Sequence, residues 1–313
     1  MARTCWVIAI TWMVGVVLVP LAGAQEIFPP SPLQGGTVTM VLPTVADPSL
    51  KTTEDDANVV VMPAQVRKTE LFVWLPGTNG HPRGDSAILS TAAEGGYRTI
   101  GLQYNDHRTA EMACGEADPE CYTHFRQERF TGDAPDAAIP NTPNEGVEHR
   151  LTMLLKYLAV HLPGQGWDTY LKGDQPNWSR IVLAGHSQGA GEAGFIAKKR
   201  EVARVVLFSG ASDGVGQTLT TRKWSSWLTA PSKTPMERWY AEYNAQERLA
   251  EAEPMAYESV LGVPANHVLV FKLDLPPAAP QKLLAAHMAV VHDPRYRPDW
   301  EWMLGLTEKR PSE

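Results

Sequence analysis

The chain has 313 residues, of which 43% are hydrophobic and 20% are charged, a balance typical of a globular protein with a large core. Its formal net charge is −7 at pH 7, and a mildly acidic chain of this kind is not expected to bind nucleic acid. The length allows two domains, although α/β proteins of this size often form only one.

The first 24 residues have the pattern of a secretory signal peptide. Arg3 supplies a positive charge, an apolar run follows from Val7 to Leu21, and Ala22-Gly23-Ala24 has the small-x-small form of a cleavage site. We therefore expect cleavage after Ala24 and a secreted or periplasmic protein without stable membrane insertion. An uncleaved N-terminal anchor is the alternative.

Short apolar and β-branched runs predict eight strands, at 37–42, 58–63, 71–75, 97–104, 180–184, 202–209, 238–244 and 267–273. Helical segments alternate with them from residue 71 onward, at 86–94, 144–162, 190–199, 254–261 and 298–306. This alternation indicates an α/β fold with a mostly parallel, doubly wound sheet that helices cover on both faces.

The helix predicted at 144–162 is the most clearly amphipathic segment of the chain. Asn144 is expected to cap it. One face of this helix is apolar at helical spacing and is expected to be buried, with Val147, Leu151, Leu154, Leu155 and Leu158.

Two segments, 105–143 and 211–235, interrupt the alternation, and we interpret both as insertions at one edge of the sheet. The first contains the two cysteines outside the signal peptide, Cys114 and Cys121. Two cysteines that flank a glycine- and proline-containing loop in an exported protein predict a disulfide bond. His124 is nearby, but too few ligands accompany it for a zinc site. The prediction is a single domain over 25–313 with two insertions.

The pentapeptide Gly185-His186-Ser187-Gln188-Gly189 fits Gly-x-Ser-x-Gly, between a predicted strand and a predicted helix. In that position the pattern forms a strained turn that exposes the serine hydroxyl at a helix N-terminus. Ser187 is therefore a candidate nucleophile. The alternative is a tight turn with a capping serine.

From about Thr37 to Leu306 the chain resembles the α/β-hydrolase superfamily. The resemblance is carried by the pentapeptide at 185–189, by the loop Leu75-Pro76-Gly77-Thr78-Asn79-Gly80, and by a late histidine, His287. It implies a nucleophile, an acid and a histidine in that chain order, without a metal or cofactor.

His287 is the candidate base, because it follows the last strand and a proline-rich loop. His292 is its rival, and His267 begins a strand and is expected at the wrong end of the sheet. Glu247 is the candidate acid by family order. Asp213, after the preceding strand, is the alternative acid, and Asp274 is a third.

The resemblance also implies an oxyanion hole, formed by the backbone N–H groups of Gln188 and Thr78. The loop departs from the His-Gly-Gly-Gly form of some esterases, so that subgroup is not implied. Four side chains are candidates for substrate contact: His186, His81, Trp224 and Trp227. For the two tryptophans, packing in the core is an equally good interpretation.

The leading hypothesis is an exported serine hydrolase that cleaves a small-molecule or polymeric carboxylic ester. A lipase with a lid is not favoured, because no convincing amphipathic cover helix is seen in 105–143. A serine peptidase or an acyltransferase would use the same residues. A catalytically silent binding protein on the same fold is the alternative from a different class. The oligomeric state and the acyl preference stay open.

Overall fold

The computed structural model describes residues 31–51, 56–116, 118–133, 141–216, 218–272 and 282–311. The predicted signal peptide with its cleavage site and the third candidate acid, Asp274, lie outside these residues.

All eight predicted strands are present and form one sheet, in the order β1-β2-β4-β3-β7-β8-β11-β12. Their bounds are β1 Gly36–Val41, β2 Asn58–Pro63, β3 Leu71–Leu75, β4 Arg98–Gly101, β7 Ile181–His186, β8 Arg204–Phe208, β11 Trp239–Asn244 and β12 Val268–Phe271. β2 runs antiparallel to both of its neighbours, and the other five pairings are parallel. The carboxyl ends of β3, β7, β8 and β11 therefore meet at one edge of the sheet.

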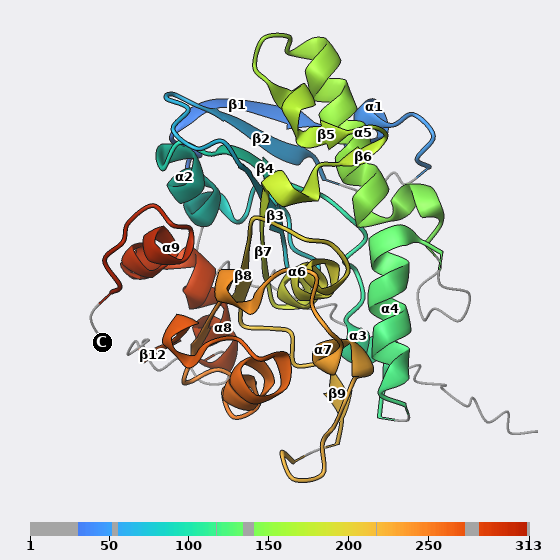
Figure 1. Cartoon of the computed structure of the whole chain (residues 1–313), viewed down its shortest axis with the longest axis vertical. Helices are drawn as coiled ribbons and strands as arrows, with labels where there is room; N and C mark the ends of the chain where they lie inside the picture. The colour runs from blue at the N-terminus through green and yellow to red at the C-terminus, as the bar shows by residue number, and fades with distance from the viewer. Residues whose placement is uncertain are drawn as a thin grey trace, which may run out of the picture.

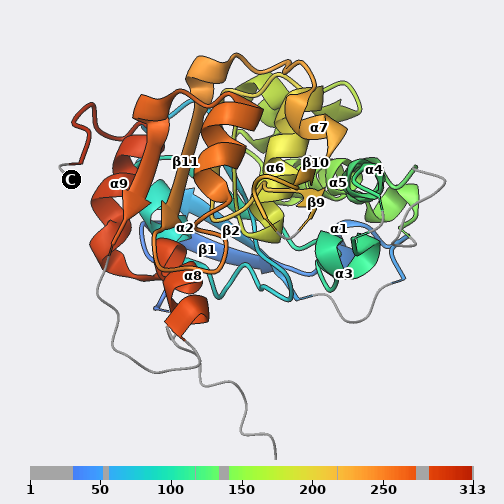
Figure 2. The ribbon, with the colours of Figure 1, turned by 90° about the horizontal axis from the view of Figure 1, so that it is seen from below.

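Helices cover both faces of this sheet (Figures 1 and 2). One face is covered by α2 (Ser86–Glu94), α8 (Lys282–His292) and α9 (Arg297–Met303). The other is covered by α4 (Glu120–Thr131), α5 (Val147–His161) and α6 (Gln188–Lys199), with the short α1 (Pro43–Ala46) on α5. The predicted α/β fold, with a mostly parallel sheet between two helical layers, is confirmed.

The apolar strands divide their side chains between two cores because successive residues of a strand point to opposite faces. In β3, the odd-numbered residues Leu71, Val73 and Leu75 pack under α5 and α6. Phe72 and Trp74 pack on the opposite side, with α2, α8 and α9. All five are fully buried, which explains why β3 reads as a continuous apolar run.

The start of α5 differs from the prediction. The helix begins at Val147, and Asn144 lies in a preceding 3₁₀ turn, Pro143–Glu145, where its side chain donates to Ser49. The prediction of Asn144 as the cap was therefore wrong. A short turn precedes the helix instead, and in this turn the Thr142 N–H donates to the Glu145 carboxylate. The predicted apolar face of α5 is buried in full.

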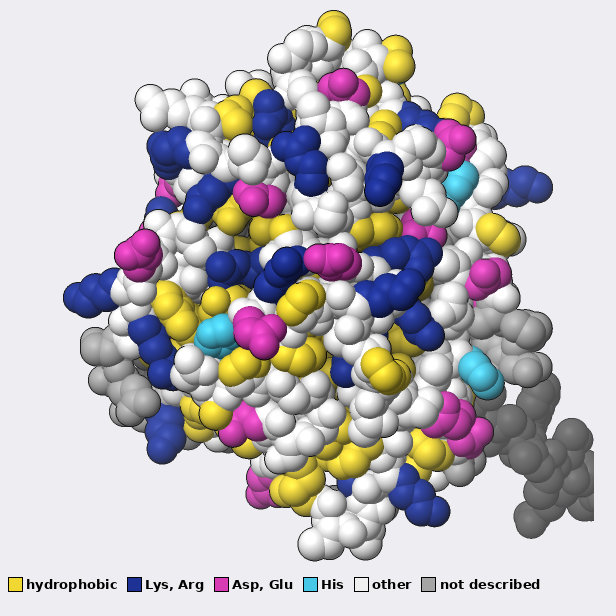
Figure 3. Space-filling model, in the orientation of Figure 1, with side chains coloured by type: hydrophobic (Ala, Val, Ile, Leu, Met, Phe, Trp, Pro, Cys, Tyr) yellow, Lys and Arg dark blue, Asp and Glu magenta, His cyan; other side chains and the backbone are white. Residues whose placement is uncertain are grey.

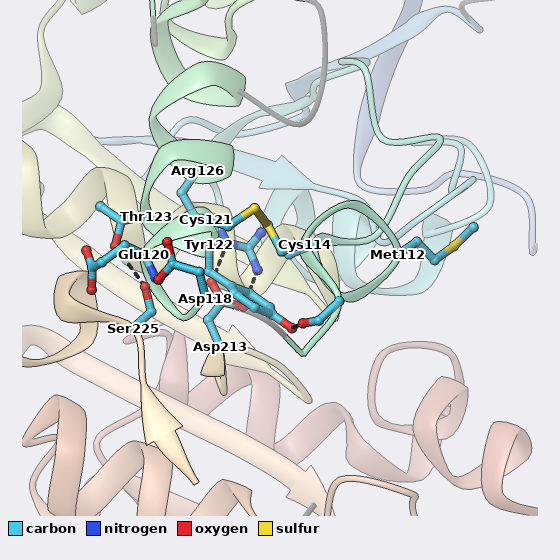
Figure 4. Close-up of a disulfide and its surroundings, with 12 residues drawn as sticks. Met112, Cys114, Asp118, Glu120, Cys121, Tyr122, Thr123, Arg126, Asp213 and Ser225 are labelled. Carbon is cyan, nitrogen blue, oxygen red and sulfur yellow. Dashed lines mark hydrogen bonds and ion pairs between the residues drawn. A yellow bond between two sulfur atoms is a disulfide. The ribbon is translucent and has the colours of Figure 1, made fainter. Parts of the chain in front are cut away.

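The segment at 105–143 contains α3 (Ala110–Cys114) and the twelve-residue α4. The predicted disulfide bond between Cys114 and Cys121 is present and joins the two helices (Figure 4). The sequence does not predict α4, because its buried face holds the charged residues Arg126, Glu128 and Arg129 as well as aromatic ones. Charged positions of this kind normally indicate a solvated face.

The segment at 211–235 forms a small hairpin of β9 (Gly214–Val215) and β10 (Lys223–Trp224), followed by α7 (Ser226–Thr229). A second hairpin, β5 (Leu171–Lys172) with β6 (Gln175–Pro176), precedes β7. The helical segment predicted at 254–261 is a π-helix, Met255–Leu261.

Basic and acidic side chains are interspersed over the face of the molecule seen in Figure 3, with apolar side chains between them. Among the described residues, no helix combines the length and the apolar character needed to cross a bilayer.

Candidate active site

Ser187 lies at the sharp turn between β7 and α6, with φ 54° and ψ −116°. Such a conformation is rare for a residue with a side chain and must be stabilised by its surroundings. A Cβ atom at Gly185 would lie 2.3 Å from the Gly189 carbonyl oxygen, and one at Gly189 would lie 2.1 Å from the Leu75 carbonyl oxygen. Both glycines are therefore required by close backbone contact, and the turn has the geometry of a nucleophile elbow.

His287 lies beside this turn. The sequence places it after a loop, whereas the structure places it within α8. Its Nδ1–H donates to the carboxylate of Glu247. The ring centroids of His287 and His186, the residue before Ser187, are 4.5 Å apart. The helix thus carries the candidate base to the carboxyl end of β7, where the elbow is.

Glu247 is buried just after β11, and its carboxylate accepts hydrogen bonds from His287, Ser209 and Asn244. Oε2 accepts from His287, while Oε1 accepts from the Ser209 hydroxyl at 2.7 Å and from the Asn244 N–H at 2.9 Å. Donors of this kind stabilise the ionised form of a buried carboxyl group. No pattern in the sequence indicated these roles of Ser209 and Asn244.

The other candidate bases have different partners. His292 contacts Asp85 through Nε2 at 3.1 Å, and its Nδ1 donates to the Met288 carbonyl oxygen. His267 donates to the carbonyl oxygen of Trp239, at the amino end of β11. Among the described residues, His287 is therefore the one of the three histidines that contacts a candidate acid, and it lies beside Ser187.

Asp213, the alternative acid, contacts Arg126 instead of His287. The two side chains form a buried pair with two hydrogen bonds of 2.8 Å (Figure 4). Trp227 also donates to Asp213, and Arg126 donates to the carbonyl oxygen of Gln188 at 2.9 Å. The pair therefore joins α4 to the first residue of α6, next to the elbow.

Glu192, in α6, is fully buried on the other side of Arg126, with 3.8 Å between Oε2 and Nη1. Burial raises the pKa of Glu192 to about 8, although Arg126 and Arg129 favour its ionised form. At neutral pH this carboxyl group is therefore mostly protonated.

Glu253 is a second buried carboxyl group next to the candidate acid, and the sequence did not point to it. It is fully buried, and no described N–H or O–H group donates to either of its oxygens. Its carboxyl group hydrogen-bonds that of Glu247, and burial, followed by the Glu247 charge, raises its pKa well above the usual range. In the sequence, Glu251-Ala252-Glu253 resembles a solvated surface segment.

The loop expected to form the oxyanion hole lies against the elbow. A Cβ atom at Gly77 would be 3.3 Å from the Cβ atom of Ser187. Asp106 holds the turn, because its carbonyl oxygen accepts from the Asn79 N–H and its side chain from the Gly80 N–H. Gln188 is the first residue of α6, so its N–H has no acceptor within the helix.

A small pocket of about 70 Å³ adjoins Ser187. Residues of α3, α4, the loop after β8, the 214–224 hairpin and the loop after β11 line it, among them Glu111, Tyr122, Asp213, Arg222 and Arg248. The segments predicted as insertions therefore form most of the wall.

None of the four side chains proposed for substrate contact lines this pocket. His186 is buried and donates to the His287 carbonyl oxygen, so it contacts α8. Trp227 is buried against Phe195, and Trp224 lies under the guanidinium of Arg222. His81 is exposed and contacts Asp56 at 3.5 Å. Charged and polar residues of distant segments line the pocket instead, and contact of these four side chains with a substrate stays a prediction.

Within the described ranges, no group of three or more His, Cys, Asp or Glu residues is arranged to hold a metal ion.

Comparison with known proteins gives neither a matching family model nor a matching curated sequence. Solved structures do match. An acetyl xylan esterase from Aspergillus awamori is 13% identical, with a TM-score of 0.41, over 72% of this chain and 77% of its own. A Pyrobaculum calidifontis esterase is 11% identical, with a TM-score of 0.45, over 86% and 85%. Thermogutta terrifontis esterase 2 is 12% identical, with a TM-score of 0.44, over 88% and 94%. Because similarity at this level says nothing about chemistry, the activities of these proteins are not transferred to this chain.

Proposed function

We propose that this protein is a serine hydrolase that cleaves carboxylic esters through an acyl-enzyme on Ser187. The observation that carries the proposal is the hydrogen bond from His287 to the buried Glu247, beside a serine at a strained strand-to-helix turn. A serine hydroxyl is a weak nucleophile unless a base accepts its proton and a carboxylate orients that base.

In the proposed reaction, Nε2 of His287 accepts the hydroxyl proton while Ser187 Oγ bonds to the ester carbonyl carbon. The N–H groups of Gln188 and Thr78 stabilise the negative charge that develops on the carbonyl oxygen. The bond to the alcohol breaks, and the alcohol leaves with the proton from His287. Water then attacks the acyl group, His287 accepts a proton from the water and returns it to Ser187, and the carboxylic acid leaves.

The direct test is labelling by a fluorophosphonate probe. We expect wild type to be labelled and Ser187→Ala to be unlabelled, with the fold of both checked by circular dichroism. Turnover of p-nitrophenyl acetate is expected to be lost in both Ser187→Ala and His287→Ala. A folded wild-type protein that takes up no label would contradict the proposal and favour a catalytically silent binding protein.

A peptidase or an acyltransferase would share the labelling result. Release of free acid from an ester in water, without transfer to an added alcohol or amine, distinguishes the ester hydrolase from both. The proposal includes export, which the disulfide bond supports because such bonds persist in oxidising compartments.

A further inference from the structure

The pocket beside Ser187 is too small and too polar for a long acyl chain. Its volume of about 70 Å³ holds only a few water-sized groups. Charged side chains contribute much of the wall, including the paired Arg126 and Asp213. An extended hydrocarbon chain would have to remove the exposed charges of this wall, those of Glu111 and Arg248, from water without replacing the hydrogen bonds that water makes to them, which is unfavourable.

The pocket fits the acyl side of an ester better than its alcohol side. The leaving alcohol must receive its proton from His287, so it has to lie within reach of that ring. His287 does not line the pocket, whereas Ser187 and Gln188 do. With the alcohol near His287, the pocket on the side of Gln188 is left for the acyl group.

Glu111 and Arg248 both line this pocket and form an ion pair, with 3.2 Å between Arg248 Nη2 and Glu111 Oε2. The same two side chains, together with Tyr122, Arg222 and Leu249, also line a second, larger cavity of about 500 Å³, which extends past Glu116 and Leu219. The ion pair therefore lies at the boundary between a small inner pocket and a large outer one.

Covalent bonds to neighbouring parts of the structure determine where Glu111 and Arg248 lie. Glu111 belongs to α3, which the disulfide bond ties to α4 (Figure 4). Arg248 directly follows Glu247, whose carboxylate accepts hydrogen bonds from Ser209, Asn244 and His287. Both side chains are more than half exposed, so their pairing contributes at most about 1 kcal/mol to stability. The pair can therefore be removed without unfolding the protein.

We infer that the Glu111–Arg248 pair limits the substrates of this enzyme to esters of short acyl groups, such as acetyl, by closing the inner pocket. The inference rests on the proposed ester hydrolase activity and specifies its substrate class. Removal of the pair would connect the inner pocket to the outer cavity and admit longer chains.

The test compares kcat/KM for p-nitrophenyl acetate, butyrate and octanoate in wild type, Glu111→Ala and Arg248→Ala. Wild type is expected to prefer acetate. In each variant, the octanoate-to-acetate ratio of kcat/KM is expected to rise about tenfold or more, the range over which pocket size discriminates between chain lengths. Glu201→Ala breaks the similar exposed pair of Glu201 with Arg238 and is the matched control, with an unchanged ratio.

A charge-reversed double variant, Glu111→Arg with Arg248→Glu, restores an ion pair and is expected to restore the preference for acetate. An octanoate preference in wild type, or ratios that do not change in the two alanine variants, would overturn the inference while leaving ester hydrolysis intact. Absence of turnover with all three esters would instead contradict the proposed function.

Discussion

The carboxyl group of Glu253 hydrogen-bonds the carboxylate of Glu247, and both are buried. Two adjacent buried carboxyl groups cannot both be ionised, so one of them must hold a proton. Glu247 already accepts hydrogen bonds from His287, Ser209 and Asn244, whereas burial raises the pKa of Glu253. Glu253 is therefore the protonated partner and donates to Glu247.

The first prediction concerns this donor. Glu253→Leu removes a hydrogen bond to a charged group, typically about 2 kcal/mol, so we expect kcat for p-nitrophenyl acetate to fall roughly 10- to 100-fold. Glu253→Gln keeps an N–H donor and is expected to retain most of the activity. Steady-state kinetics of both variants, together with their thermal unfolding, checks this.

Glu242 offers a matched control, because it is fully buried in β11 and hydrogen-bonds the carboxyl group of Asp299 in α9. Glu242→Leu is expected to change stability with little effect on kcat. If Glu253→Leu had wild-type kcat, Glu253 would have no role in positioning Glu247.

The second prediction separates the two candidate acids. Glu247→Gln removes the carboxylate that orients His287, and in a comparable triad such a loss lowers kcat by roughly 10⁴. Asp213→Asn instead leaves the Arg126 charge buried without its partner, which typically costs about 3–5 kcal/mol of stability. We expect the first variant to stay folded with very low turnover, and the second to lose stability in urea unfolding.

Turnover of the Asp213→Asn variant is to be measured at a temperature at which it remains folded. If it then lost as much activity as Glu247→Gln, the proposed acid would be wrong. If both variants kept wild-type turnover, neither carboxylate would orient the base.

The strands and the elbow are predictable because their signals are local. β3 and β7 are short apolar runs. The turn at Ser187 leaves no room for a side chain at Gly185 or Gly189, so the glycines of the motif indicate it directly. The order of Ser187, Glu247 and His287 follows from the family resemblance, and the structure brings the last two into contact.

The lining of the pocket is not predictable in this way. Arg126 and Asp213 are 87 positions apart, and Glu111 and Arg248 are 137 apart. Each of these residues has the sequence character of a solvated surface position, and only the folded arrangement pairs them. For Trp227 the sequence left substrate contact and core packing equally open, and in the structure its side chain is buried and donates to Asp213.

The third prediction concerns the glycines of α6. Gly189→Ala would place a Cβ atom 2.1 Å from the Leu75 carbonyl oxygen, which no side-chain rotation can relieve. We expect a strongly destabilised protein, beyond the 1–3 kcal/mol usual for overpacking. Gly194, five residues along the same helix, is the control: its added Cβ atom would lie at least 3.4 Å from the nearest atom, on Trp227.

Alanine favours a helix over glycine by up to about 1 kcal/mol, so Gly194→Ala is expected to keep the stability of the protein or to raise it slightly. Thermal unfolding of the two variants measures the contrast. Equal effects at both positions would show that the backbone contact of Gly189 with Leu75 does not constrain the elbow.

The fourth prediction is the pH dependence of stability at Glu192. Its pKa is raised from the usual 4.5 to about 8 by burial, so between these values the unfolded chain is ionised at this position while the folded protein keeps the proton. The protonated Glu192 therefore contributes fully to the free energy of unfolding below pH 4.5. This contribution is lost as pH rises toward 8, at about 1.4 kcal/mol per pH unit. Glu192→Gln cannot ionise and is expected to lack this loss.

Urea unfolding of wild type and Glu192→Gln at several pH values between 5 and 8 tests the sign directly. Other buried carboxyl groups, Glu242 and Glu253, have pKa values raised in the same direction, so the wild-type curve alone does not isolate Glu192. The informative quantity is the free energy of unfolding of the variant minus that of wild type, which is expected to increase with pH. Glu201→Gln, at an exposed position, corrects for the loss of one carboxylate. A difference that stays constant or decreases over this range would mean that Glu192 is ionised in the folded protein, held by Arg126.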